Sequence, residues 1–190
     1  MKDRTAQLRL VHTTSPVSED DPLDFDAIFL RYSPYAAVIA ARIMGNEDDV
    51  DDIVQDVFID VHKGLSTLKS ALHVKGWVAT ITVRVCAKRL RLRKLHRFLM
   101  PAWSSLSEQE AYEIPQKGLA PDEQLWLKHI YAVLDTMAIP LRVAWTLRYL
   151  QEEKLEQVAK LCGCSLATAK RRIFKAHQMI RSVVDQDGAL

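Results

Sequence analysis

Apolar residues recur at helical spacing along most of this chain, and this pattern constrains the fold more than any other feature of the sequence. Within 25–44 they occupy Phe25, Ile28, Phe29, Tyr32, Tyr35, Ala36, Ile39 and Ile43. The same spacing returns at 53–61, 78–99, 125–137 and 141–150. Six glycines and seven prolines are few for 190 residues, and 48% of the residues are apolar. We therefore expect a globular, all-α protein.

Several residues mark where these helices begin and end. Gly45 suits the end of the first helix, and Asn46 is a good N-cap for the second, which Gly64 ends. Pro34 is expected to kink or divide the first helix. A loop is expected at 66–75, before a long helix. The apolar face of that long helix is predicted at Val78, Ile81, Val85, Leu92, Leu95 and Leu99.

The helical pattern breaks at 100–121. This segment contains three prolines and the run SSLS, and it has no apolar period. We interpret it as a flexible linker between two small helical domains, at 23–99 and at 122–185. Residues 1–22 are polar and aperiodic, so we interpret them as a loose N-terminal tail.

Composition and motifs exclude several classes of protein. The longest apolar run, Tyr35–Ala41, is far too short to span a membrane, and the first residues lack the apolar segment of a signal peptide. Three cysteines fit a reducing compartment, so we expect a cytoplasmic protein without membrane insertion. The chain has no P-loop, no GxGxxG and no nucleophile elbow, so we expect neither enzymatic activity nor a cofactor.

The charges of the chain are segregated, although they nearly balance to a net charge of +2. The segment 44–60 has seven carboxylates and no Lys or Arg, whereas 84–97 has seven Lys or Arg and no carboxylate. A protein that binds a basic partner with one face and nucleic acid with another needs such sorting.

The segment LEQVAKLCGCSLATAKRRIFKAHQMI has the order of a helix-turn-helix motif. Gly163 tolerates the positive φ of a tight turn, and Ser165 can cap the second helix. That helix is predicted to pack Leu166, Ala169, Ile173, Ala176 and Ile180 inward. A helical hairpin with a solvated basic face is the alternative to a DNA-binding motif.

The second helix of this motif is also predicted to read DNA. The predicted contacts come from Ser165, Ala167, Thr168, Lys170, Arg171, Arg172 and Lys175. Lys170 and Arg171 are expected to read base edges in the major groove. Arg172 and Lys175 are expected to contact phosphates.

The basic segment 84–97 is a second candidate nucleic-acid surface, because a helix with arginines along one stripe can follow phosphates. Contacts are predicted from His73, Lys75, Trp77, Arg84, Lys88 and Arg91. Trp77 could stack on an unpaired base, although packing in the core is the interpretation that we favour for this residue.

The acidic helix carries Asp52, Asp56 and Asp60 at i, i+4 and i+8, a like-charge ladder that costs about 0.2–0.5 kcal/mol per adjacent pair. Two explanations stay open. The carboxylates pair with 84–97 of the same domain, or they form a docking face for a basic protein surface. The predicted docking face consists of Asp49, Asp52, Gln55, Asp56 and Asp60.

Cys162 and Cys164 flank the turn glycine. Their C-x-C spacing is not that of ordinary zinc sites, so we interpret them as small packing residues and expect no metal.

Three motifs, taken in order, resemble those of extracytoplasmic-function (ECF) sigma factors of the sigma-70 family. DVDDIVQDVFIDVHKGL is similar to the core-polymerase-binding helix of that family, and VKGWVATITVRVCAKRLRLRK to its promoter-melting and −10-recognition helix. AIPLRVAWTLRYLQEEKLEQVAKLCGCSLATAKRRIFKAHQMIR is similar to its −35-reading domain. The resemblance runs from about Phe25 to Arg181.

This resemblance implies a region 2 domain at 23–99 and a region 4 domain at 122–185. It also implies binding to core RNA polymerase and promoter DNA, frequent control by an anti-sigma factor, and no catalysis by the chain itself. The chain departs from the family at Val83–Cys86, where Asn or Asp is frequent, and at the turn sequence Cys-Gly-Cys. Lys154 stands where the family often has a serine cap.

Two other functions are weighed against this one. A stand-alone helix-turn-helix regulator would bind DNA without polymerase, but it would need neither the acidic helix nor the long linker. A thiol- or metal-responsive sensor would use Cys162, Cys164 and His177.

Overall fold

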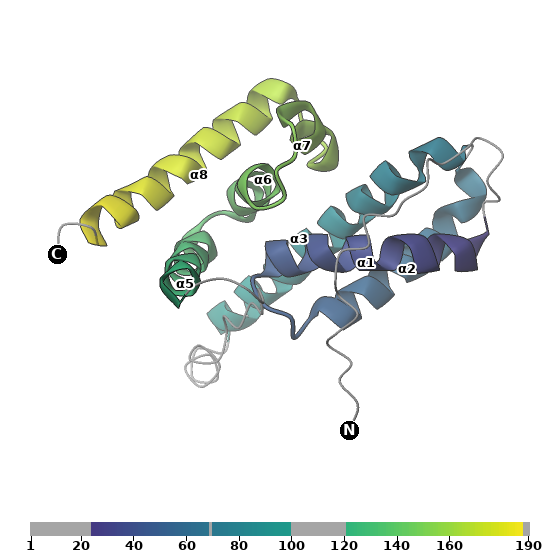
Figure 1. The fold of residues 1–190 in the computed structure, drawn as a ribbon, viewed down its shortest axis with the longest axis horizontal. Coiled ribbons are helices and arrows are strands. Elements are labelled where there is room, and N and C mark those ends of the chain that lie inside the picture. Colours follow the sequence, from purple (N-terminus) through teal and green to yellow (C-terminus); the bar gives the residue numbers. More distant parts are fainter. Residues whose placement is uncertain (1–23, 69, 100–120, 188–190) are drawn as a thin grey trace.

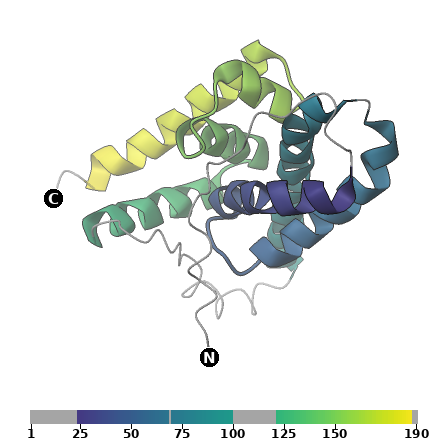
Figure 2. The ribbon, with the colours of Figure 1, turned by 45° about the vertical axis from the view of Figure 1, so that its right-hand side comes forward.

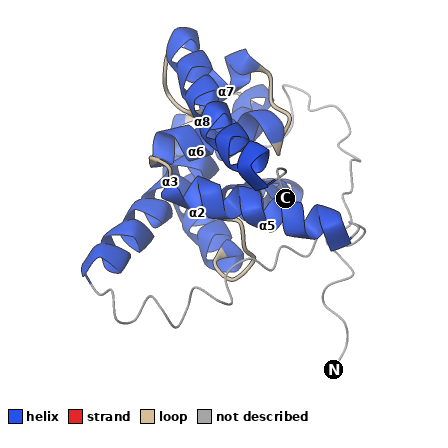
Figure 3. Cartoon of the chain, turned by 90° about the vertical axis from the view of Figure 1, so that its left-hand side faces the viewer, coloured by secondary structure: helices blue, strands red, loops and turns tan. Residues whose placement is uncertain are grey.

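The computed structural model describes residues 24–68, 70–99 and 121–187 (Figure 1). Their helices are α1 (Phe25–Met44), α2 (Val50–Gly64), α3 (Val74–Leu99), α5 (Pro121–Thr136), α6 (Ile139–Tyr149), α7 (Leu155–Leu161) and α8 (Leu166–Asp187). Two short 3₁₀ helices, η2 (Leu65–Thr67) and η3 (Ala71–His73), precede α3. Figure 3 shows only helices and loops in this part of the chain, so the expected all-α fold is confirmed. The predicted tail and nearly all of the predicted linker lie outside the described residues.

Helix α1 begins at a side-chain cap and ends at a left-handed glycine. The carboxylate of Asp24 accepts a hydrogen bond from the amide of Ala27 at 3.2 Å. Gly45 has a φ of 81°, and its amide donates to the carbonyl of Ala41, so the predicted helix end is confirmed. Pro34 does not divide the helix, which runs unbroken for 20 residues. Pro34 and Leu30 are both exposed, so water can solvate the Leu30 carbonyl that receives no hydrogen bond from proline.

The prediction that Asn46 caps the second helix is wrong. Helix α2 begins four residues later, at Val50, and Asn46 is only 7% exposed. Its side-chain amide donates to the carboxylate of Asp48, and its oxygen accepts a hydrogen bond from Arg93 of α3. The side-chain oxygen of Asn46, which an N-cap would use, therefore binds Arg93 of the distant helix α3 instead.

Helix α3 is continuous over 26 residues, but its predicted apolar face is wrong beyond the middle of the helix. Val78, Ile81 and Val85 are buried, whereas Leu92 and Leu95 are each 53% exposed and Leu99 is 65% exposed. The helix starts at Val74, so the predicted loop at 66–75 is shorter than expected and partly folded into η2 and η3. Only the first two thirds of α3 lie in the core.

The two halves of the chain pack on one another. Helices α6 and α7 contact α3, and α6 also contacts α1 (Figures 1 and 2). One continuous hydrophobic core includes Ile43 and Val83 from the first half and Val143 and Leu161 from the second. A second core joins α5, α6 and α8. The division into domains at 23–99 and 122–185 stays a prediction.

Candidate nucleic-acid and protein interfaces

Helices α7 and α8 form the predicted helix-turn-helix. Gly163 has a φ of 59°, which confirms the predicted left-handed turn, and the amide of Cys164 closes the turn by donating to the carbonyl of Ala159 at 3.0 Å. Ser165 caps α8, because its hydroxyl accepts a hydrogen bond from the amide of Thr168 at 3.2 Å. Lys154, at the start of α7, makes no side-chain cap. The turn therefore fixes where α8 starts.

One face of α8 is buried and the opposite face is basic. Ala169, Ile173, Ala176 and Ile180 are at most 6% exposed, as predicted. Leu166 was expected inside but is 37% exposed, because it stands in the first turn, beyond the packed part of the helix. Among the predicted DNA contacts, Ser165, Ala167, Lys170, Arg171 and Lys175 are exposed, and Thr168 and Arg172 are half-buried. No carboxylate occurs between Ser165 and Ser182, so this face carries only positive charge.

The second predicted nucleic-acid surface lies on α3 and η3. Arg84, Lys88 and Arg91 share one exposed stripe of α3, and His73 is exposed in η3. Lys75 lies in the first turn of α3, with its Nζ 5.0 Å from the centre of the Tyr35 ring.

Trp77 is half-buried and packs against the core. A Cβ at Gly64 would lie 2.8 Å from its ring, so the glycine leaves room for the indole. The preferred core role of Trp77 is consistent with this packing.

The acidic helix α2 uses some of its carboxylates inside the protein. Asp49 pairs with Arg93, and Asp56 pairs with Arg89 at 3.4 Å, both across to α3. Asp52, Gln55 and Asp60 are exposed. None of these three has a side-chain partner among the residues that the structure describes. Pairing within the domain therefore applies to Asp49 and Asp56, whereas Asp52 and Asp60 remain available for a docking face.

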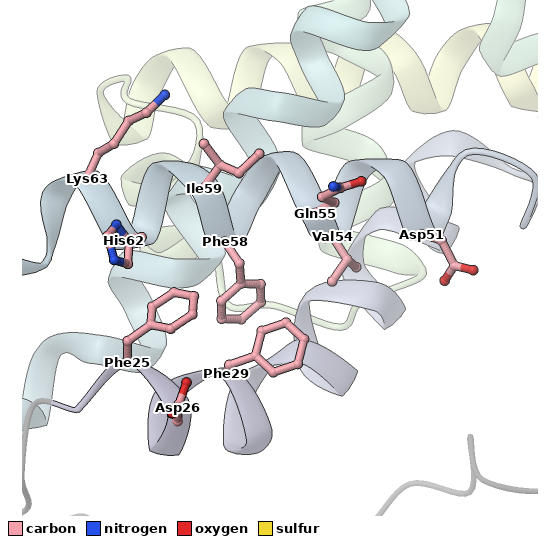
Figure 4. Close-up of a pocket in the computed structure, with 10 residues that line it drawn as sticks. All are labelled: Phe25, Asp26, Phe29, Asp51, Val54, Gln55, Phe58, Ile59, His62 and Lys63. Atoms are coloured by element: carbon pink, nitrogen blue, oxygen red, sulfur yellow. The ribbon is translucent and has the colours of Figure 1, made fainter.

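An apolar groove of about 740 Å³ runs beside the acidic face, between α1 and α2 (Figure 4). Phe29 packs edge-on against Phe58, with 4.9 Å between the ring centres, and Phe25 packs edge-on against the same ring at 6.3 Å. Phe29 and Ile59 are 39% and 44% exposed. Gln55 also lines the groove, so polar and apolar surfaces are continuous.

The apolar part of this surface was not predicted. Phe25 and Phe29 fit the apolar period of the first helix, which does not show that they are partly exposed. The available signal was Ile59, which stands beside Asp60 on the polar side of α2. A single exposed apolar side chain is normal on a helix, so Ile59 alone was a weak signal, and only the fold shows that it lines the same groove as Phe29.

Cys162, Cys164 and His177 are not grouped as the ligands of a metal site. Burial raises the pKa of Cys162 to about 11, with a further contribution from Cys164, and burial also raises the pKa of Cys86 to about 12. His177 stacks on Tyr149 instead, with 5.3 Å between the ring centres. Among the described residues, no group of three or more His, Cys, Asp or Glu side chains is placed to hold a metal ion. Nor is any described helix long and apolar enough to cross a membrane.

Comparison with known proteins identifies the class to which this fold and these surfaces belong. Residues 28–96 match Sigma-70 region 2, and residues 127–180 match Sigma-70, region 4. The chain is 26% identical over 177 residues to the ECF RNA polymerase sigma-E factor of Escherichia coli strain K12, covering 88% of this chain and 90% of that protein. It is 25% identical over 143 residues to the RNA polymerase sigma factor SigV of Bacillus subtilis strain 168, covering 75% of this chain and 80% of that protein.

Solved structures show the same fold. The sigma factor RpoE from Bartonella quintana, in complex with the anti-sigma factor NepR, superposes with a TM-score of 0.60 at 20% identity, over 86% of this chain and 98% of that one. CnrH, in complex with the cytosolic domain of CnrY, gives a TM-score of 0.57 at 22% identity, over 86% and 88%. This chain belongs to the sigma-70 family, in its ECF group. The resemblance inferred from the three sequence motifs is thereby confirmed.

Proposed function

We propose that this chain is a promoter-specificity subunit of RNA polymerase. It binds core polymerase and directs the enzyme to particular promoters, and it acts in the cytoplasm. The observation that carries the proposal is the combination, in one chain, of exposed unpaired carboxylates on α2 and a carboxylate-free basic face on α8. The order of regions 2 and 4 along the chain supports it. Catalysis belongs to the polymerase, and this chain contributes recognition.

The acidic helix binds a basic surface of core polymerase. Asp52, Gln55 and Asp60 are free to face that partner, and the neighbouring groove accepts apolar side chains. Asp49 and Asp56 belong to the same face, where their pairs with Arg93 and Arg89 hold α2 against α3. Charge complementarity steers such an encounter, and buried apolar contacts at its centre hold the complex.

The −10 region is engaged by the basic stripe of α3 and by the residues before it. Arg84, Lys88 and Arg91 follow phosphates, and each contact releases counterions. His73, Lys75 and Trp77 lie at the other end of the surface, where an unpaired base of melted DNA can stack on the accessible part of the half-buried Trp77 ring.

The −35 element is read by α8 in the major groove. Lys170 and Arg171 reach base edges, and Arg172 and Lys175 contact phosphates, while Ser165, Ala167 and Thr168 border the groove at the start of the helix. An anti-sigma factor is a further partner, since the solved relative RpoE is bound to one.

Run-off transcription tests the proposal. Core polymerase is supplied with or without this protein on a promoter library, and specific transcripts are expected only when the protein is present. A stand-alone helix-turn-helix regulator predicts DNA binding without specific transcripts and without association with core polymerase. That result would refute the proposed function.

A further inference from the structure

A cavity of about 260 Å³ lies where the helix-turn-helix packs against α3 (Figure 2 shows the two side by side). Its walls come from α3, α6, the end of α7 and α8. Three arginines line it: Arg84 and Arg91 from α3, and Arg172 from α8. No carboxylate is among its lining residues. The cavity is therefore basic and is shared by the two halves of the chain.

The other arginines of α3 are paired. Arg89 pairs with Asp56, Arg93 with Asp49, and Arg97 approaches Asp135 at 3.9 Å. By contrast, none of the three cavity arginines has an ion pair with any residue that the structure describes. On α3, the paired arginines Arg89 and Arg93 therefore face α2, whereas the unpaired Arg84 and Arg91 line the cavity.

Three unpaired guanidinium groups around one cavity repel one another. Arg84 and Arg91 remain exposed to solvent, which screens part of this repulsion, and Arg172 is half-buried. An anion between the three groups would remove the remaining repulsion. Guanidinium groups bind phosphate through paired N–H donors, which makes phosphate the anion that three arginines lining one cavity suit best.

We propose that this cavity binds a small oligophosphate, which bridges α3 and α8 and holds the two halves of the chain together. The volume is slightly below the roughly 300–1,000 Å³ typical of sites for drug-sized ligands, so it suits two or three phosphates. This part of the proposal rests on the proposed function: the bound oligophosphate regulates the protein because it competes with promoter DNA. Arg84 and Arg91 are assigned there to the −10 region and Arg172 to the −35 element, so DNA and oligophosphate need the same side chains.

Isothermal titration of the full chain with sodium tripolyphosphate, at fixed ionic strength and without DNA, tests the site. We expect saturable binding with one ligand per chain. Arg84→Ala and Arg172→Ala are each expected to weaken binding about tenfold, because each removes charge-assisted hydrogen bonds. Arg171→Ala is the matched control, since it removes the same charge from the neighbouring position of α8, outside the cavity, and is expected to change affinity less than about twofold.

Equal weakening by all three variants, or heat that never saturates, would mean that the anion responds to net charge and that no such site exists. Circular dichroism of each variant confirms that it is folded before titration. A rise in melting temperature with tripolyphosphate concentration, lost in Arg172→Ala, gives an independent measure of binding.

A second arm separates free oligophosphate from DNA phosphate as the source of the anion. Binding of a promoter duplex is measured with tripolyphosphate and with sulfate at matched ionic strength, because salt alone weakens DNA binding. A larger loss with tripolyphosphate supports competition, and equal losses refute it. If the titration finds the site but run-off transcription fails, the proposed function falls and the anion site stands. If transcription is specific but the titration finds no site, the anion site falls and the proposed function stands.

Discussion

The guanidinium of Arg142 in α6 lies against the last turn of α1, with its Nε 3.0 Å from the carbonyl oxygen of Ile43. Its second terminal nitrogen donates to the carbonyl of Met44 at 2.7 Å, and the first pairs with Asp135. Carbonyls at the end of a helix lack helical partners and attract positive charge. Because Arg142 is only 2% exposed, this one side chain joins the second half of the chain to the first.

Replacing Arg142 with methionine should destabilise the protein strongly. The variant leaves the two carbonyls without their donor and Asp135 without its closest partner, and breaking a buried pair of this kind costs about 3–5 kcal/mol. Urea denaturation measures the loss. Arg89→Met is the control, because its pair with Asp56 is 30% and 56% exposed and is expected to contribute only about 0–1 kcal/mol. Similar losses for the two variants would contradict a joining role for Arg142.

Comparing alanine substitutions at Gly45 and Gly163 measures the contact between Gly45 of the first half and Tyr131 of the second. Both have positive φ, of 81° and 59°, so alanine strains the backbone at either position by about 1–2 kcal/mol. A Cβ at Gly45 would also lie 2.5 Å from the ring of Tyr131, whereas a Cβ at Gly163 meets nothing within 4 Å. Gly45→Ala should therefore lower the free energy of unfolding by about 1–3 kcal/mol more than Gly163→Ala. Equal effects in urea denaturation would mean that Tyr131 moves aside freely.

Much of the secondary structure could be predicted from the sequence, because local rules decide it. The helical spacing of apolar residues predicts where the helices lie. Glycine tolerates positive φ, which predicts the helix end at Gly45 and the turn at Gly163. Asn46 fails as a cap because Arg93, 47 residues away, takes its oxygen. Leu92 fits the helical period but is exposed, since a period cannot tell how far a neighbouring helix extends.

The arrangement of the candidate surfaces could not be predicted in the same way. Charge segregation pointed to α2 and α3, but only the packing of the two helices decides that Asp56 is paired and Asp52 is free. Arg142 carries no local signal at all, because an arginine within an amphipathic helix is usually at the surface. The cavity between the halves is formed by segments that are distant in the sequence, so it can be recognised only once the fold is known.

Glu153 should make the packing of the halves dependent on pH. Burial raises the pKa of this half-buried carboxyl above its ordinary value of 4.5, and Lys75 of α3 partly offsets that rise. A carboxyl with a raised pKa in the folded state contributes stability below about pH 4.5, and that contribution is lost as pH rises through the raised value. Glu153→Gln should therefore raise the melting temperature at pH 7 relative to wild type, and this gain should disappear at pH 4.

Glu156→Gln, at an exposed position of α7, controls for the loss of a charge, and it should change the free energy of unfolding by no more than about 0.5 kcal/mol. Lys75→Met removes the offsetting charge and should lower the melting temperature at pH 7. A Glu153→Gln effect that is the same at both pH values would show that this carboxyl does not link stability to pH.

Arg171 and Lys175, both exposed on α8, should differ in what they contribute to DNA binding. Arg171→Ala removes a proposed base contact and should relax sequence preference at one position by about 1–3 kcal/mol of discrimination. Lys175→Ala removes a proposed phosphate contact, so binding weakens evenly across sequences and the salt slope falls by about one unit. Binding to a library of −35 sequences at several salt concentrations measures both effects. Exchanged phenotypes would place the opposite face of α8 toward the bases.

Asp52 and Asp60 should separate polymerase binding from stability, because both are exposed and neither is paired within the described part of the chain. Asp52→Lys with Asp60→Lys should leave the melting temperature nearly unchanged, since surface replacements usually alter the free energy of unfolding by no more than about 0.5 kcal/mol. Association with core polymerase should be lost in a pull-down, because like charges facing each other across an interface cost several kcal/mol.

The matched control for this variant is Glu152→Lys with Glu156→Lys, which makes the same change in net charge at two exposed carboxylates of the second half. It should bind core polymerase as the wild type does. Asp56→Asn adds a second comparison, because it breaks the pair with Arg89 and leaves the free carboxylates in place, so association should fall less than with the double lysine variant. If the double lysine variant still associates fully with core polymerase while remaining folded, α2 does not bind the enzyme through these carboxylates, and the apolar groove of Phe29 and Ile59 becomes the surface to test next.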